Sequence, residues 1–138
     1  MKKVHEVMTR DIHVAAPDQT LAEAAAEMAR ADIGCLPVGD KDKLVGMITD
    51  RDIVVRAVAR GLGSDTPVRD VMTESIKYCY DDQDVAEVAR NMAELGVRRL
   101  PVVNRDKRLV GVIALSNIAQ GADDKVTDTL LRGVATPH

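Results

Sequence analysis

The sequence predicts an α/β (α+β) fold made of two similar repeats, each with the element order β-α-β-β-α. Three short motifs occur twice, 64 or 65 residues apart, and this period is too long for most solenoid repeats. We expect the two copies to pack about a pseudo-two-fold axis and to leave two related clefts between them. The recurring motifs are Val7-Met8-Thr9 with Val71-Met72-Thr73, Leu36-Pro37-Val38 with Leu100-Pro101-Val102, and Leu44-Val45-Gly46 with Leu109-Val110-Gly111.

These spacings divide the chain into a first repeat at residues 1–62, a second repeat at residues 63–121 and a C-terminal tail at residues 122–138. The offset grows from 64 to 65 between the second and third motifs, so one residue is inserted there. In the tail, four apolar residues predict a docking helix, namely Val126, Leu130, Leu131 and Val134.

Each repeat opens with a short segment, residues 4–8 or 68–72, that leads to a brief strand at residues 12–14 or 76–78. Thr66 before Pro67 is a helix-start signal with proline at the first helical position. An amphipathic helix follows, and in the first repeat Thr20 and Glu23 predict a capping box at its start. Its apolar stripe is Leu21, Ala24, Ala25 and Met28, matched by Val85, Val88, Ala89 and Met92 in the second repeat.

After each helix the sequence predicts a hairpin and a second helix. The inner strands are residues 35–38 and 100–103, the polar turns residues 39–43 and 104–108, and the outer strands residues 44–48 and 109–113. The closing helices run from Asp50 to about Arg60 and from Leu115 to about Gln120. Gly61 and Gly121 are placed to end them.

Composition excludes several classes of protein. A net charge of −3, with Tyr78 and Tyr80 as the only aromatic residues, argues against non-specific nucleic-acid binding. No apolar run approaches the roughly 20 residues of a membrane span. Cys35 and Cys79 occupy non-equivalent positions in the two repeats and no export signal is visible, so we expect reduced thiols in a cytoplasmic protein.

The strongest local signal is the segment from Gly46 to Asp52, in which a strand runs directly into a helix. Thr49 and Asp52 have the spacing of a capping box, which by itself would account for both residues. The free N–H groups of a helix start also suit a phosphate, and Asp52 could accept hydrogen bonds from a ribose diol. Gly46 would let a flat base approach the strand.

These motifs, in doubled form, resemble the cystathionine-β-synthase (CBS) domain, and the tandem pair resembles a Bateman module. The similarity covers about residues 4–120. It implies an adenosine ligand such as AMP, ADP, ATP, NAD(H) or S-adenosylmethionine, with Thr49 at the phosphate and Asp52 at the ribose. It also places His13 of the first strand beside the base, and Ile12 and Pro37 are expected among the nucleotide-binding residues.

The second repeat departs from this pattern. Ala114 stands where the first repeat has Thr49, and Asn117 stands where it has Asp52, so the second cleft is weak, empty or suited to a different ligand. The same repeat carries Arg98 and Arg99 just before its inner strand, where the family often has a phosphate-binding residue. One or both could equally be solvated. Arg51 is a weaker candidate for an anion contact.

The sequence therefore predicts a non-catalytic regulatory module that binds an adenine nucleotide, forms a homodimer and signals to an effector protein. The alternative is a structural dimerisation module in which Thr49 and Asp52 serve only as a helix cap. No nucleophile, acid–base pair or set of metal ligands is present in the sequence pattern, so we expect neither an enzyme nor a metal site. Residues 53, 54, 57 and 58 offer an apolar helix face for the dimer.

Overall fold

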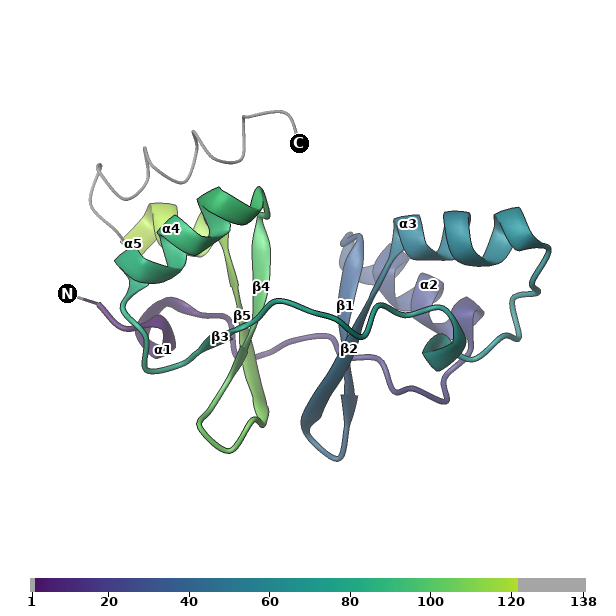
Figure 1. The fold of residues 1–138 in the computed structure, drawn as a ribbon, viewed down its shortest axis with the longest axis horizontal. Coiled ribbons are helices and arrows are strands. Elements are labelled where there is room, and N and C mark those ends of the chain that lie inside the picture. Colours follow the sequence, from purple (N-terminus) through teal and green to yellow (C-terminus); the bar gives the residue numbers. More distant parts are fainter. Residues whose placement is uncertain (1, 122–138) are drawn as a thin grey trace. The chain divides into compact units, whose positions relative to one another are not determined.

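The computed structural model describes residues 2–121, and these fold into two units with separate cores (Figure 1). Unit 1 contains residues 2–12 and 77–121, and unit 2 contains residues 13–76. Both units combine helices with a small sheet, which confirms the predicted α/β class. The predicted tail at residues 122–138, with its docking helix, lies outside the described residues.

The units exchange their opening motifs, so they do not coincide with the sequence repeats. Thr9 exchanges two backbone hydrogen bonds with Val112, with N···O distances of 2.9 and 3.0 Å. Thr73, from the second repeat, does the same with Met47 of the first repeat at 2.8 and 2.9 Å. Each unit therefore joins the Val-Met-Thr motif of one repeat to the hairpin of the other. The boundaries at residues 62 and 121 remain a prediction about sequence similarity.

Unit 2 is built around the antiparallel hairpin of β1 (Cys35–Asp40) and β2 (Lys43–Thr49), with Leu36 opposite Ile48. Helix α2 (Leu21–Ala31) begins with the predicted capping box, because the Glu23 N–H donates to Thr20 Oγ1 at 3.1 Å. After β2 the chain is helical from Asp50 to Arg60 in three successive forms. These are α3 (Asp50–Asp52), the π-helix η1 (Ile53–Ala57) and the 3₁₀-helix η2 (Val58–Arg60).

Unit 1 has a three-stranded sheet in which β3 (Cys79–Tyr80) is parallel to β4 (Arg99–Val103), and β4 is antiparallel to β5 (Leu109–Ala114). Its helices are α1 (Val4–Val7), α4 (Val85–Leu95) and α5 (Leu115–Gly121). In Figure 1 the N-terminal segment, drawn in purple, lies among these green and yellow elements. This placement follows from the motif exchange.

The predicted element order is confirmed in the second repeat, but the first strand is absent from the first repeat and misplaced in the second. Residues 12–14 form no strand, and only Ala15 makes an isolated bridge, to Val38. In the second repeat the strand lies at Cys79–Tyr80, not at residues 76–78. Because the pairing is only one or two residues long, it leaves no readable alternation of apolar and polar side chains. The 3₁₀-helix η3 (Val68–Asp70) starts one residue later than predicted, with Pro67 as its N-cap.

The hairpin turns explain the inserted residue. In unit 2 the turn is the two-residue loop Lys41–Asp42, and both residues have positive φ (52° and 67°), as in the mirror-image turns that suit twisted hairpins. In unit 1 five residues, 104–108, lie between the paired Val103 and Leu109, whereas four, 40–43, lie between the equivalent pair Gly39 and Leu44 of unit 2, and the difference is the inserted residue. The Asn104 side chain closes this loop, because its Oδ1 accepts the N–H groups of Asp106 and Arg108, both at 3.0 Å.

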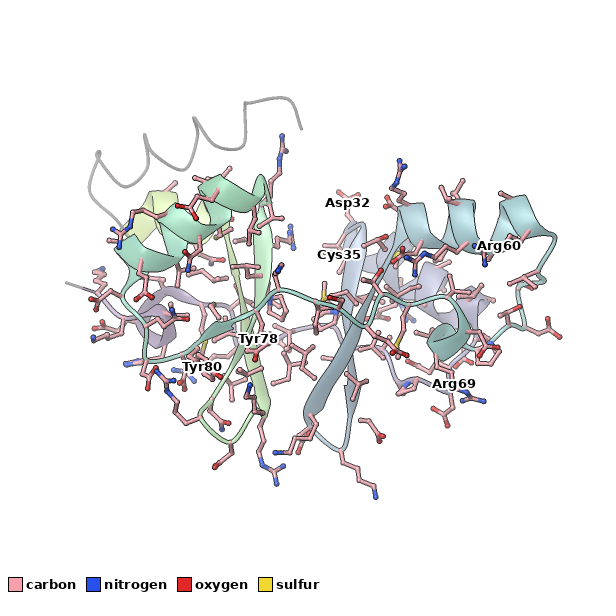
Figure 2. All side chains as sticks on the ribbon, in the orientation of Figure 1. Asp32, Cys35, Arg60, Arg69, Tyr78 and Tyr80 are labelled. Atoms are coloured by element: carbon pink, nitrogen blue, oxygen red, sulfur yellow. The ribbon has the colours of Figure 1, made fainter. Side chains whose placement is uncertain are left out.

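The two tyrosines fix the longer loop to strand β3 (Figure 2). Tyr78 and Tyr80 meet edge to face with centroids 5.8 Å apart, and the Arg105 guanidinium lies 4.1 Å from the Tyr80 centroid. Lys107 Nζ donates to the Tyr78 hydroxyl at 2.6 Å, which lowers the pKa of Tyr78 and raises the pKa of Lys107. Arg105 also forms a two-pronged ion pair with Asp82. Both tyrosine rings therefore contact cationic side chains of their own unit.

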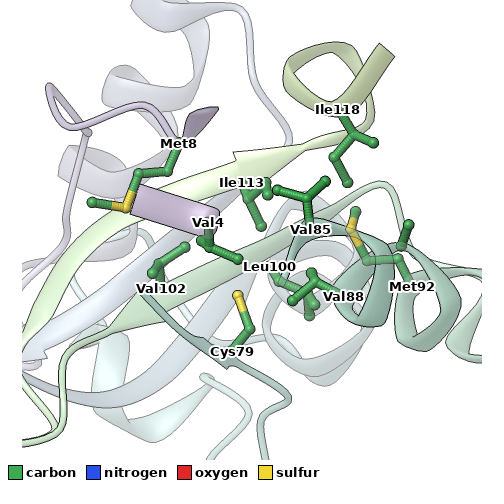
Figure 3. Packing of buried hydrophobic residues seen from close by; sticks show 11 residues of the cluster. Val4, Met8, Cys79, Val85, Val88, Met92, Leu100, Val102, Ile113 and Ile118 are labelled. Atoms are coloured by element: carbon green, nitrogen blue, oxygen red, sulfur yellow. The ribbon is translucent and has the colours of Figure 1, made fainter. Parts of the chain in front are cut away.

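Each unit has an aliphatic core, as expected from a sequence without Phe or Trp. In unit 1 the side chains of β4, β5, α1, α4 and α5 converge on Ile113, which is fully buried (Figure 3). In unit 2 the corresponding centre is formed by Leu36, Val38 and Ile48.

None of the helices described is long and apolar enough to cross a bilayer.

Cys79 is a core residue of unit 1, and burial raises the pKa of its thiol to about 12, with a smaller contribution from Asp81. Since the thiolate is the reactive form, we expect Cys79 at pH 8 to react with Ellman's reagent about a thousandfold more slowly than an exposed thiol. A Cys35→Ser variant isolates the measurement, and guanidinium should restore fast labelling. Fast labelling of Cys79 in the native protein would contradict this burial.

Candidate functional site

The turn between β2 and α3 holds Thr49 and Asp52 in the predicted capping box. Thr49 Oγ1 accepts the Asp52 N–H at 3.0 Å, and Asp52 Oδ2 accepts the Thr49 N–H at 3.1 Å. These two bonds use one lone pair of the hydroxyl and one oxygen of the carboxylate. The hydroxyl proton of Thr49 and the second carboxylate oxygen, Oδ1, are not needed for the cap. The local reading of both residues as a helix cap is therefore correct, and it leaves hydrogen-bonding capacity for a ligand.

Two residues that the sequence analysis missed surround Asp52 Oδ1. The Thr73 hydroxyl donates to this oxygen at 3.4 Å, and Arg56 Nε lies 3.8 Å from it. Arg56 also donates through Nη1 to the carbonyls of Val71 and Met72, both at 3.3 Å. The Asp52 side chain is 13% exposed, so a negative charge lies mostly covered at a site lined by donors. The only sequence signal for Thr73 was the recurrence of the Val-Met-Thr motif.

The equivalent turn of unit 1 keeps one of the two cap hydrogen bonds, and the bond to its Val-Met-Thr threonine runs in the opposite direction. Asn117 Oδ1 accepts the Ala114 N–H at 2.8 Å, so asparagine preserves half of the cap. Asn117 Nδ2 then donates to Thr9 Oγ1 at 3.3 Å, whereas in unit 2 the threonine donates to the carboxylate. This turn presents no carboxylate acceptor, and the position equivalent to Arg56 is Gly121.

The space beside Gly46 is filled by the protein itself, which corrects the expectation that a base approaches there. A Cβ on Gly46 would lie 2.7 Å from Met72 Sδ and 3.0 Å from the Thr73 carbonyl oxygen. At Gly111 the corresponding distances are 2.8 Å to Met8 Sδ and 2.7 Å to the Thr9 carbonyl oxygen. Both glycines are thus required for close approach of the exchanged Val-Met-Thr motifs.

The other predicted site residues are distributed over both units. Unit 2 holds Arg51, which is exposed beside the turn, and Pro37, which is buried with its carbonyl accepting the Ala15 N–H at 2.9 Å. It also holds His13, whose exposed ring pairs with Glu27. Unit 1 holds the half-buried Ile12 and the exposed Arg98 and Arg99, together with Ala114 and Asn117.

Glu27 ties His13 to helix α2. The hydrogen bond from His13, followed by the contact with Arg30, lowers the pKa of the Glu27 carboxyl. The imidazole is therefore engaged with a carboxylate, while the backbone of residue 13 makes no regular strand. Within residues 2–121 no group of three or more His, Cys, Asp or Glu side chains is arranged to hold a metal ion.

Comparison with known proteins identifies the family. The CBS domain family matches residues 4–58 and 68–123, so this chain belongs to it as a tandem CBS domain pair. The CBS domain-containing protein YhcV of Bacillus subtilis is 36% identical over 119 residues, which cover 86% of this chain and 84% of YhcV.

Solved structures of similar proteins contain different ligands. CBSX2 in complex with AMP matches with a TM-score of 0.77 at 27% identity, over 87% of this chain and 95% of that chain. The CBS domain pair of protein MJ0100, in complex with 5′-methylthioadenosine and S-adenosyl-L-methionine, matches with a TM-score of 0.73 at 27% identity, over 87% and 94%. Hypoxic Response Protein I with two coordinated zinc ions matches with a TM-score of 0.79 at 34% identity, over 88% and 100%.

Proposed function

We propose that this protein is a non-catalytic regulatory module that binds an adenosine ligand (AMP, ADP, ATP, NAD(H) or S-adenosylmethionine) at the Thr49–Asp52 turn. The observation that supports this most is the state of Asp52. One carboxylate oxygen holds the helix cap at 3.1 Å, while the other has only contacts of 3.4 and 3.8 Å. Asp52 Oδ1, with such long contacts and on a side chain that is still 13% exposed, can accept a shorter, charge-assisted bond from a ribose hydroxyl.

The roles within this proposal follow the chemistry of each group. Thr49 accepts a backbone N–H and retains its hydroxyl proton for a phosphate oxygen, at the start of an eleven-residue helical run from Asp50 to Arg60. We assign the base to Ile12, His13 and Pro37. Arg98 and Arg99, with Arg51 as a weaker candidate, are assigned to anionic groups of the ligand. The Ala114–Asn117 turn is proposed as a weaker second site.

Parallel calorimetric titrations with AMP, ATP, NADH and S-adenosylmethionine test this proposal. In Asp52→Ala we expect the affinity for the bound ligand to fall by about 1.5–3 kcal/mol, because a charged hydrogen-bond acceptor is lost. The lost cap should also lower the free energy of unfolding by about 1 kcal/mol. Asp50→Ala is the matched control, since Asp50 is an exposed neighbouring carboxylate outside the proposed contact.

Three results would each oppose a part of this proposal. Absence of binding by any of the four ligands, in protein shown to be ligand-free, would favour the structural dimerisation module. Equal affinities of the wild type and Asp52→Ala would move the ligand away from this turn. A ligand without the ribose hydroxyls that binds as well as AMP would remove Asp52 from ribose recognition.

We also propose a homodimer formed through the helical run of unit 2. Of the four residues predicted for the dimer face, Val54 (58%) and Val58 (66%) are exposed, whereas Ala57 is 1% exposed and Ile53 packs against the core of unit 2, so the predicted face is wrong in these two residues. The exposed apolar side chains of this segment are Val54, Val55 (47%), Val58 and, two residues after the run ends, Leu62 (42%). The sequence-equivalent residues of the second repeat are Ala119, Gln120, Asp123 and Thr127, so the apolar face is confined to the first repeat. A two-fold interface uses the same patch on both copies, so unit 2 of one copy should face unit 2 of the other.

We expect Val58→Asp to weaken the dimer at least about 100-fold, because the two-fold axis brings two like charges together in an apolar interface. Light scattering behind size exclusion, across a dilution series, measures the dissociation. Val14→Asp is the control, since Val14 is also exposed (41%) but lies outside this helix. An unchanged dimer in Val58→Asp would place the interface elsewhere.

We further propose a cytoplasmic location and an effector protein as the receiver of the signal.

A further inference from the structure

The contacts at Asp52 point to a residue outside the predicted site. Thr73 closes the Val-Met-Thr motif that unit 2 receives from the second repeat, and the chain leaves unit 2 three residues later, at Ile76. Its backbone is fixed to Met47 by two hydrogen bonds, and its hydroxyl donates to Asp52 Oδ1 at 3.4 Å. The same carboxylate oxygen is the one that the helix cap leaves available.

Arg56 connects the same elements a second time. Its Nε lies 3.8 Å from Asp52 Oδ1, while its Nη1 donates to the carbonyls of Val71 and Met72 at 3.3 Å. One guanidinium thus spans from the carboxylate to the backbone that carries Thr73. Asp52 is held from both sides, with Oδ2 on the Thr49 N–H and Oδ1 between Thr73 and Arg56.

We propose that Thr73 and Arg56 are positioning residues, which hold Asp52 so that Oδ1 can accept a ligand hydroxyl and which link occupancy of that oxygen to residues 71–73. This inference rests on the proposed function. A carboxylate side chain that is already fixed loses less conformational freedom when a ligand binds. Linkage is reciprocal, so a ligand on Asp52 also strengthens the attachment of the segment that leads into unit 1.

Unit 1 supplies the natural comparison. There the equivalent threonine, Thr9, makes the same pair of backbone bonds, to Val112, but its hydroxyl accepts from Asn117. The position equivalent to Arg56 is a glycine, Gly121, so the second repeat has no counterpart of the Arg56 side chain at this position. Thr73 and Arg56 therefore contact the one of the two turns that carries a carboxylate, as a positioning role requires.

The test is a calorimetric titration with AMP, or with the member of the ligand panel that binds, and with its 2′,3′-dideoxy analogue. We expect Thr73→Val to weaken binding of the hydroxyl-bearing ligand about five- to tenfold, since one hydrogen bond to the carboxylate is lost. Thr73→Ser should restore the affinity to within about twofold, because it returns the hydroxyl. Thr9→Val should leave the affinity at the Thr49–Asp52 turn unchanged, since Thr9 contacts Asn117 of the other turn. The dideoxy analogue should bind the wild type and Thr73→Val equally, since it makes no bond to Asp52.

Amide hydrogen exchange supplies the second readout. The ligand should slow exchange of the Thr73 amide in the wild type and much less in Thr73→Val, while the Met47 bonds keep the variant folded. Equal affinities of the wild type and Thr73→Val, failure of Thr73→Ser to restore binding, or equal weakening of the dideoxy analogue would each overturn the inference. If the wild type binds none of the panel, the proposed function itself fails. If it binds and Thr73→Val matches it, only this inference fails.

Discussion

Replacing Ile113 with alanine is expected to lower the free energy of unfolding by about 3–4 kcal/mol. Ile113 is 0% exposed and lies in β5 among buried side chains from the other elements of unit 1 (Figure 3). Val4 enters this core from the exchanged N-terminal segment, Val85 from α4 and Leu100 from the neighbouring strand. Because strands and helices close around the side chain from several directions, the cavity left by alanine cannot collapse fully. Urea unfolding followed by circular dichroism measures the change.

Ile113→Val is the matched variant, because it removes a single methylene and should cost about 1 kcal/mol. Ile48 is the equivalent residue of the first repeat, at 0% exposure in β2, and Ile48→Ala should cost a similar amount in unit 2. A loss below about 1 kcal/mol in Ile113→Ala would mean that the core of unit 1 rearranges around the missing side chain. That result would contradict the packing described here.

Local signals predicted the amphipathic helices, the closing helices and both hairpins, because these signals lie in neighbouring residues; the short helix α1 was not predicted. The capping box of Thr20 and the apolar stripe that follows it place α2, and the turn residues between the paired strands place both hairpins. The brief first strands were misplaced because they pair through one or two residues only. The exchange of the opening motifs was not predicted, because a repeat in sequence does not show which copy of a partner it will contact.

In the candidate site, too, the residues with the strongest local signal were predicted and the residue that only the fold brings close was not. Thr49 and Asp52 are three residues apart and follow a strand, so local pattern and family resemblance both identify them. Arg56 follows Asp52 at the i,i+4 spacing of a helix ion pair, a signal that the sequence analysis did not use. Thr73 lies 21 residues from Asp52, and that spacing has no recognisable meaning without the fold. The expectation that a base approaches the strand at Gly46 was wrong for the same reason, because it depended on a residue from another part of the sequence. Gly46 makes room for Met72, which comes from the second repeat.

Replacing Gly111 with alanine is expected to cost about 2–3 kcal/mol of folding free energy, because the added methyl group overpacks a fixed backbone contact. Its Cβ would lie 2.7 Å from the Thr9 carbonyl oxygen, which is itself held by the Val112 N–H at 3.0 Å. The carbonyl cannot move away without breaking this bond. We therefore expect thermal unfolding at a lower temperature and, by amide exchange, faster opening of the Thr9 and Val112 amides.

Gly46→Ala tests whether the backbone contact decides the cost. Its Cβ would lie 3.0 Å from the Thr73 carbonyl oxygen, and the shorter contact of 2.7 Å is to Met72 Sδ, an atom on a flexible side chain. We expect a cost of about 1 kcal/mol here, since the thioether can move aside. Gly63→Ala, which would meet only the side-chain oxygen of the exposed Asp65, should be close to neutral. If Gly111→Ala and Gly63→Ala lower the free energy of unfolding equally, the packing of the exchanged Val-Met-Thr segment does not depend on glycine at position 111. The expected order of Gly111, Gly46 and Gly63 would identify the close approach of the Val-Met-Thr motif as the reason for the glycine in Leu-Val-Gly.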